Sequence, residues 1–185
     1  MRDPAPPYAG EGPHAPWHAS EDDSIRAFRP HRAATSFEDA EVVWAVDTRH
    51  LPMFWFPRDC PRATFWPSSA TSPADLERFF DGETKRVHAT EHAWLDRIRS
   101  AAVVAYRLPE GTFRPHPAVG GYWVSDEAVQ PIEVVRLGDL IARHAESGIE
   151  LRFVRNLWPL WDRVTRSTVE FSGSRLRNAS PRDQP

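Results

Sequence analysis

The chain alternates short apolar runs with polar turns, and its densest apolar stretch lies between Glu41 and Pro67. Within this stretch, residues 42–46 form an apolar run rich in β-branched side chains. A run this short cannot form a helix alone and predicts a buried strand, and residues 63–66 predict a second one. Between them, Thr48 is expected to cap a short helix, because Pro52 is tolerated in a first turn whose N–H groups lack partners.

The remaining pattern predicts short strands and short helices in mixed order. The clearest helix start is Ser72-Pro73, with serine as N-cap and proline at the first helical position; Gly82 is expected to end that helix. Further strands are predicted at residues 16–20, 86–89, 101–108, 121–125, 131–135, 149–154 and 169–171, and further helices at residues 24–28, 90–98, 137–146 and 157–166. Without strict βαβ alternation, this order predicts an α+β fold with short flanking helices and a mixed, largely antiparallel sheet or a split pair of sheets.

The composition is typical of one globular domain. A chain of 185 residues with 41% hydrophobic content and eight tryptophans can bury one core, which we expect over residues 15–177, between disordered tails at 1–14 and 178–185. The net charge of −3 excludes a global attraction for nucleic acid or anionic lipid. The single cysteine excludes an internal disulfide, and no segment resembles a signal peptide or a membrane helix. A cytoplasmic location and no membrane partner are therefore expected.

The turn from Pro57 to Arg62 holds several reactive side chains beside apolar sequence. Its two prolines fix φ and hold Arg58, Asp59, Cys60 and Arg62 in defined places. Arginines beside a cysteine lower its pKa, which favours a thiolate nucleophile. The commoner outcome is a buried structural cysteine. Independently, Arg58 and Asp59 could equally be functional or form an internal ion pair that holds the turn.

Histidines provide a second group of candidates. His18 and Ser20 lie two apart on a predicted strand, so both face one side and can approach one ligand, although such a histidine often only binds backbone. The pair His88 and His92 has i, i+4 spacing but straddles a predicted strand-to-helix junction, and no zinc motif is present, so no metal site is predicted.

Arginines and tryptophans are mixed near the C-terminus. This mixture permits binding of single-stranded nucleic acid by charge and stacking. Trp158 and Trp161 are three residues apart, however, which is the spacing of an ordinary buried helix face. Packing is therefore the favoured interpretation.

Five short motifs follow one another along the chain in a fixed order. They are His-x-Ser-Glu-Asp from residue 18, Val-Trp-Ala-x-Asp from residue 43, Phe-Pro-Arg-Asp-Cys-Pro-Arg from residue 56, Tyr-Trp-Val-Ser-x-Glu from residue 122 and Ser-Gly-x-Arg-Leu-Arg-Asn-Ala from residue 172. Over residues 16–179 this order resembles an uncharacterised bacterial domain family of unknown function. At a greater distance, it is similar to the ADP-ribosyltransferase-like fold.

The distant resemblance implies a pocket for NAD as a substrate. It implies that His18 holds the adenosine ribose, that Phe54 or Trp55 stacks on nicotinamide, and that a carboxylate grips the other ribose while the glycosidic bond opens. That carboxylate would be Glu127 or Glu133. A carboxylate beside a developing sugar cation stabilises it. Arg58 or Arg62 could then bind the pyrophosphate through a guanidinium fork.

Three functional hypotheses follow. The first is a protein that binds a nucleotide such as NAD and that, if catalytic, is an ADP-ribosyltransferase. The sequence does not specify whether its acceptor is nucleic acid or protein. Its pocket would be lined by His18, Ser20, Phe54, Trp55, Arg58 and Glu127. The alternative is a non-catalytic binding or interaction domain in which the Arg-Asp-Cys-Pro turn is structural. The third is a hydrolase that depends on Cys60.

Overall fold

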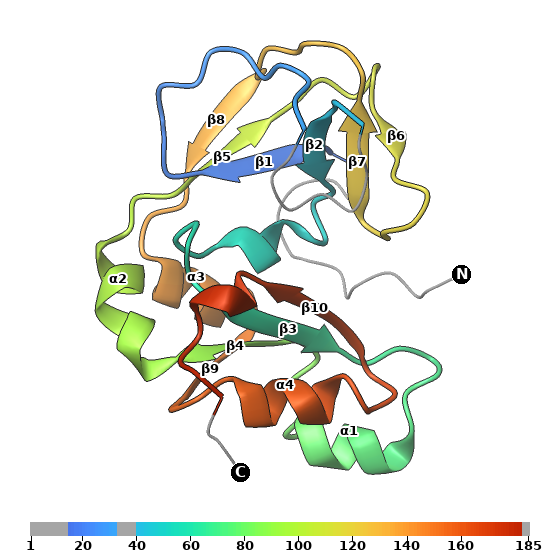
Figure 1. The fold of residues 1–185 in the computed structure, drawn as a ribbon, viewed down its shortest axis with the longest axis vertical. Coiled ribbons are helices and arrows are strands. Elements are labelled where there is room, and N and C mark those ends of the chain that lie inside the picture. The colour runs from blue at the N-terminus through green and yellow to red at the C-terminus, as the bar shows by residue number, and fades with distance from the viewer. Residues whose placement is uncertain (1–14, 33–39, 183–185) are drawn as a thin grey trace. The chain divides into compact units, whose positions relative to one another are not determined.

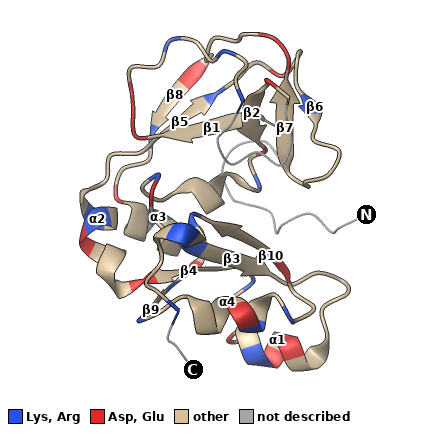
Figure 2. Cartoon of the chain, in the orientation of Figure 1, with Lys and Arg blue, Asp and Glu red and all other residues tan. Residues whose placement is uncertain are grey.

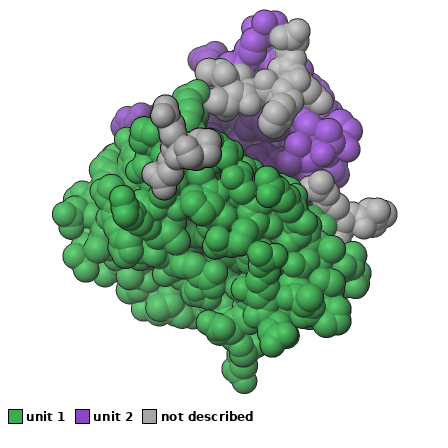
Figure 3. Space-filling model, turned by 60° about the horizontal axis from the view of Figure 1, so that its bottom comes forward, with its two compact units in different colours: residues 1–6, 56–101, 138–185 green, residues 7–55, 102–137 purple. Residues whose placement is uncertain are grey.

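The computed structural model describes residues 15–32 and 40–182. The tail predicted at residues 1–14 and most of the polar connection at 31–39 lie outside the described residues. The chain forms two compact units, coloured separately in Figure 3. Within the described residues, unit 1 comprises 56–101 and 138–182, and unit 2 comprises 15–32, 40–55 and 102–137. The fold is α+β, with one sheet in each unit (Figure 1).

Unit 2 contains a six-stranded antiparallel sheet of order β6-β7-β2-β1-β5-β8. The strands are β1 (Trp17–Ser20), β2 (Val43–Val46), β5 (Val104–Arg107), β6 (Arg114–Pro115), β7 (Tyr122–Ser125) and β8 (Glu133–Arg136). Apolar side chains on one face pack with those of the following loops, and this core contains Phe28, Val43, Ala45, Val104, Tyr106, Leu108, Phe113 and Val129. We call this face the core face of unit 2. The 3-10 helix η1 (Leu51–Phe54) follows β2.

Unit 1 contains a four-stranded mixed sheet of order β10-β3-β4-β9. The strands are β3 (Arg62–Trp66), β4 (Val87–Glu91), β9 (Glu150–Val154) and β10 (Glu170–Ser174), and only the β4–β9 pair is parallel. The helices are α1 (Pro73–Phe79), α2 (Leu95–Ser100), α3 (Leu140–Glu146) and α4 (Trp158–Val164), with the 3-10 helices η2 (His92–Trp94) and η3 (Leu176–Asn178). The predicted strand at residues 149–154 corresponds to β9, which lies at an edge of the sheet.

The two faces of the unit 1 sheet differ in chemistry because side chains alternate along each strand. One face is apolar and packs against α1 and α4, through residues such as Phe65, Phe79 and Leu160 (Figure 1). The opposite face buries polar side chains on the two central strands and just before β4, namely Arg62, Thr64, Arg86, His88 and Thr90. Hydrogen bonds must therefore compensate for the desolvation of this polar face.

Several local predictions are confirmed and others are wrong. Ser72 caps α1 by accepting a hydrogen bond from Asp75 N, with Pro73 as the first helical residue. Thr48 does not cap η1; its Oγ1 accepts a hydrogen bond from Trp17 Nε1 at 3.0 Å. Thr90, the expected start of the helix predicted at residues 90–98, lies instead within β4, and its hydroxyl donates to Pro61 O at 2.7 Å.

The helix predicted at residues 24–28 is absent. Ile25 N donates instead to the Tyr106 hydroxyl, which itself donates to Asp22 O, and Phe28 pairs with Val129. These partners lie far along the chain, so the backbone groups of this segment are satisfied without a helix.

The residues from Asn178 to Arg182, predicted as part of a tail, are described and make specific contacts. Ser180 donates from its backbone N and its hydroxyl to the carboxylate of Glu91, which also accepts from Leu157 N. Glu91 is 1% exposed, so these donors compensate for its buried charge.

Two buried histidines face each other on the polar side of unit 1. His144 Nδ1 lies 2.6 Å from Leu140 O, so it carries the proton, and His144 Nε2 then accepts from His88 Nδ1 at 3.0 Å. Burial lowers the pKa of His144 to about 4 and lowers the pKa of His88 well below its usual value. Both imidazoles are therefore neutral at pH 7.

The lowered pKa values predict acid sensitivity. Above pH 6.5 these imidazoles are neutral in both the folded and the unfolded chain. Between pH 6.5 and about 4 the unfolded chain binds protons at both histidines, whereas the folded chain does not. The free energy of unfolding is then expected to fall by ~1.4 kcal/mol per pH unit for each histidine. Urea titrations at several pH values measure this slope. A double substitution, His88→Gln with His144→Gln, should flatten it, whereas the exposed control His92→Gln should not; equal slopes in all three proteins would contradict the prediction.

Candidate functional site

His18 lies where two strands of unit 2 separate. Strands β1 and β2 pair at one position, Trp17 with Val46, and then diverge. In place of a backbone donor, His18 Nδ1 donates to Trp44 O at 3.1 Å. The imidazole is half-buried, and its centroid lies 4.8 Å from that of the Phe28 ring. The hydrogen bond and the ring contact therefore fix the position of the imidazole.

Ser20 follows on the same side of β1. It is buried, and its Oγ accepts a hydrogen bond from Asp22 N at 3.1 Å. The serine thus stabilises the acidic turn that follows β1.

Glu127 lies in the turn after β7, and its carboxylate is exposed. Ser125 Oγ shapes the turn by accepting from Glu127 N at 3.1 Å. Two residues further on, Val129 pairs with Phe28, the residue whose ring packs on His18. The segment that carries Glu127 therefore crosses the core face of unit 2, which is the side toward which His18 projects.

The other candidate carboxylate, Glu133, projects to the opposite side. His18 is in register with Tyr106, which is in register with Val134. Because side chains alternate, Glu133 points away from the side shared by His18 and Val134. The register thus favours Glu127 over Glu133.

Phe54 of η1 and Trp55, which follows it, have environments that differ from that of His18. Phe54 packs against Tyr122, with ring centroids 6.2 Å apart. The next residue on β7, Trp123, packs against the core face, so Tyr122 points to the opposite face of the sheet. Trp55 is fully buried. Phe54 therefore contacts the side of the sheet opposite to that of His18. The aromatic ring beside His18 is that of Phe28, and no sequence motif indicated this contact.

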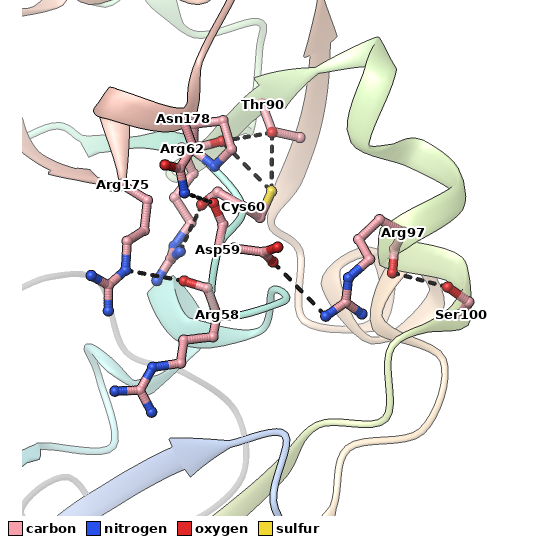
Figure 4. Close-up of polar contacts among 10 residues, drawn as sticks. Arg58, Asp59, Cys60, Arg62, Thr90, Arg97, Ser100, Arg175 and Asn178 are labelled. Atoms are coloured by element: carbon pink, nitrogen blue, oxygen red, sulfur yellow. Dashed lines mark hydrogen bonds and ion pairs between the residues drawn. The ribbon is translucent and has the colours of Figure 1, made fainter.

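The Arg58–Arg62 turn lies in unit 1, where side chains bind three successive carbonyl groups (Figure 4). Arg175 Nε donates to Arg58 O at 3.1 Å, Asn178 Nδ2 donates to Asp59 O at 2.7 Å, and Arg62 Nη1 donates to Cys60 O at 3.0 Å. Two of the five sequence motifs are thus in direct contact. The closing Ser-Gly-x-Arg-Leu-Arg-Asn-Ala motif holds the turn, and only its place in the motif order could have indicated this.

Cys60 is buried and structural, as the commoner of the two interpretations predicted. Its Sγ lies 3.3 Å from Thr90 Oγ1, whose own proton goes to Pro61 O. Burial raises the pKa of the thiol to about 11, and the neighbouring Arg62 offsets only part of this effect. The thiol is protonated at neutral pH, which does not favour a cysteine nucleophile.

The charged side chains of the turn differ in surroundings. The Asp59 carboxylate lies 3.8 Å from Arg97 Nη2, so its observed ion pair is with α2. Arg62 is 4% exposed and lies over the Phe56 ring, whereas Arg58 is exposed. Arg58 is thus the more accessible arginine for an external anion.

Two negative findings apply to the described ranges, 15–32 and 40–182. No three histidine, cysteine, aspartate or glutamate side chains gather there in a metal-binding arrangement. No helix in these ranges has both the length and the apolar character needed to cross a membrane.

Comparison with known proteins identifies a family. No curated protein and no solved structure gives a significant match. A family of unknown function, DUF6886, matches residues 17–179, which include all but the first residue of the segment over which the motifs occur. The chain therefore belongs to the family of unknown function DUF6886.

Proposed function

We propose that the chain binds a nicotinamide nucleotide such as NAD, and that transfer of its ADP-ribose group is the reaction this binding serves. The observation that carries the proposal is the position of His18, half-buried and held by Trp44 O where β1 and β2 separate. The order of the sequence motifs and the α+β fold with two separate sheets give further support from the ADP-ribosyltransferase-like resemblance.

His18 and Ser20 are proposed to bind a ribose of the nucleotide. A ribose offers hydroxyl groups that both donate and accept, so it suits an imidazole nitrogen and a serine hydroxyl that retains its own proton. Because Nδ1 is held by Trp44 O, Nε2 is the ring nitrogen proposed to contact the ribose. Phe28 supplies an aromatic surface next to the imidazole.

Glu127 is proposed as the catalytic carboxylate. When the bond between nicotinamide and ribose breaks, positive charge develops on the sugar, and a nearby carboxylate stabilises it electrostatically. The exposed carboxylate of Glu127 is open to such a substrate. In unit 1, Arg58 rather than Arg62 can contact an external anion, because only Arg58 is exposed.

Calorimetry with NAD tests the binding step. We expect heat of binding at millimolar or lower NAD, and at least about tenfold weaker binding for His18→Ala, because a hydrogen bond to the ribose is lost. His31→Ala is a matched control, since His31 also holds a backbone carbonyl through Nδ1 but is exposed. No binding to the native chain at millimolar NAD would overturn the proposal.

A carboxylate-to-amide substitution separates chemistry from binding. Glu127→Gln is expected to bind NAD normally but to release nicotinamide about 100-fold more slowly, because the amide carries no charge to stabilise the sugar cation. Nicotinamide release is measured with water as the acceptor. Glu133→Gln serves as the control and should react at the native rate. Loss of the reaction in Glu133→Gln but not in Glu127→Gln would contradict the assignment of Glu127.

The alternative, a non-catalytic interaction domain with a structural turn, is favoured by one observation. Side chains from outside the turn or from its end bind three successive turn carbonyls, as expected of a scaffold. If this bracing is the purpose of the turn, Asn178→Ala should lower the free energy of unfolding by ~1 kcal/mol, because Asp59 O loses its donor. Arg177→Ala, which removes an exposed side chain of the same helix, should leave it unchanged.

Denaturant unfolding of the three proteins measures these differences. Equal stability of Asn178→Ala and the native chain would remove the scaffold interpretation. The interaction-domain alternative is preferred if Asn178→Ala is destabilised while NAD fails to bind the native chain.

A further inference from the structure

Side chains of unit 1 bind the three residues that follow Ala179. Ser180, Pro181 and Arg182 form neither a helix nor a strand. The side chains that contact them come from β4, from α4 and from the turn before α4. We call these four the segment site: Glu91, Asn156, Trp158 and Asp162. Their contacts define the chemistry that this site recognises.

The segment site binds each backbone polar group from Ser180 N to Pro181 O. The Glu91 carboxylate accepts from Ser180 N and from Ser180 Oγ, each at 2.9 Å. Trp158 Nε1 donates to Ser180 O at 2.9 Å. Asn156 Nδ2 donates to Pro181 O at 2.9 Å. Because proline has no N–H, a Ser-Pro dipeptide leaves no backbone donor unsatisfied here, and side chains alone recognise it.

Arg182 is bound through its charge and its planar shape. Asp162, the acidic residue of α4 (red in Figure 2), accepts from Arg182 Nη1 at 2.7 Å and from Nη2 at 3.1 Å. These hydrogen bonds lower the pKa of the Asp162 carboxyl. The same guanidinium lies over the Trp158 ring, 4.1 Å from its centroid. Lysine lacks the planar fork that matches a carboxylate, so the site favours arginine.

Contacts within unit 1 hold two of these side chains in place independently of the bound segment. The Glu91 carboxylate also accepts from Leu157 N at 2.9 Å. Asn156 Oδ1 accepts from Trp158 N at 2.9 Å, which directs the amide nitrogen to the segment. A site whose groups are already ordered loses less entropy when a ligand binds. The segment site is therefore pre-organised for an extended peptide.

The segment itself is held by polar contacts more than by apolar burial. Pro181 and Arg182 are exposed and Ser180 is half-buried, whereas Ala179 packs against the core of unit 1. A segment with little buried apolar area and exposed backbone opens at a lower free energy than the core does. A peptide of the same sequence can therefore replace residues 180–182 while the unit stays folded.

We propose that the segment site recognises a Ser-Pro-Arg sequence in an extended segment of a partner protein. The chain's own residues 180–182 occupy the site as an internal competitor, which reduces its apparent affinity for the partner. A partner that carries this sequence outside helices and sheets is suited to the site, because its backbone groups are available. The site lies in unit 1 and depends on neither His18 nor Glu127.

Fluorescence anisotropy with a labelled Asn-Ala-Ser-Pro-Arg peptide tests the site. Arg182→Ala weakens the internal competitor and is expected to bind the peptide about tenfold more tightly than the native chain. Adding Asp162→Asn should cancel this gain, because the arginine of the peptide loses its carboxylate. The side chains of Arg182 and Asp162 are 55% and 34% exposed, so these changes leave the core intact. Arg177→Ala, which removes an exposed arginine outside the segment, is the matched control and should bind as the native chain does.

A second peptide and the oligomeric state complete the test. The peptide Asn-Ala-Ser-Pro-Ala should bind Arg182→Ala about tenfold more weakly than the arginine peptide does. The proposal is overturned if Arg182→Ala does not bind the arginine peptide at millimolar concentration, or if added Asp162→Asn leaves the affinity unchanged. A native dimer that Arg182→Ala dissociates would also contradict it, because the segment of a second copy would then be the occupant. None of these results bears on NAD binding through His18.

Discussion

The hydrogen bond from His18 to Trp44 O is the interaction on which the candidate site of unit 2 depends. Two paired strands normally satisfy each other's carbonyl groups, and a carbonyl left without a donor in a part-buried place is unfavourable. Where β1 and β2 diverge, an imidazole replaces the missing backbone donor. One hydrogen bond therefore satisfies the carbonyl group where the strands separate and also sets the orientation of the imidazole ring.

Unit 1 uses the same kind of interaction for another purpose. The turn at residues 58–62 exposes successive carbonyl groups that no strand pairs, and side chains satisfy them. Because the donors Arg175 and Asn178 lie more than a hundred residues away in sequence, the turn keeps its shape only when the chain's closing motif is folded against it. The guanidinium groups of Arg58 and Arg175 are brought together by this bracing.

Much of the fold follows from local sequence. The strands β2 and β3 were predicted from apolar runs, and α1 from the Ser72-Pro73 start, since these signals act within a few residues. The failures have long-range causes. Threonine is a common helix cap, but strand pairing and a hydrogen bond to the Pro61 carbonyl determine the position of Thr90. The segment from residue 24 to 28 is kept non-helical by the hydrogen bond from Ile25 N to the Tyr106 hydroxyl. No local pattern contains such partners.

The site was predictable to the same extent. The period of a strand placed His18 and Ser20 on one side, and it also places Glu133 on the opposite side once the register is known. The register itself, the path of η1 onto the opposite side, and the packing of Phe28 on His18 depend on tertiary contacts. The aromatic neighbour of His18 could therefore not be identified from sequence.

The most direct test is the tautomer of His18, read from its ring ¹⁵N chemical shifts in a labelled protein at neutral pH. A proton on Nδ1, with an Nε2 resonance that shifts when NAD is added, is the predicted result. A proton on Nε2, or an imidazole whose resonances do not respond to NAD, would contradict the role assigned to His18.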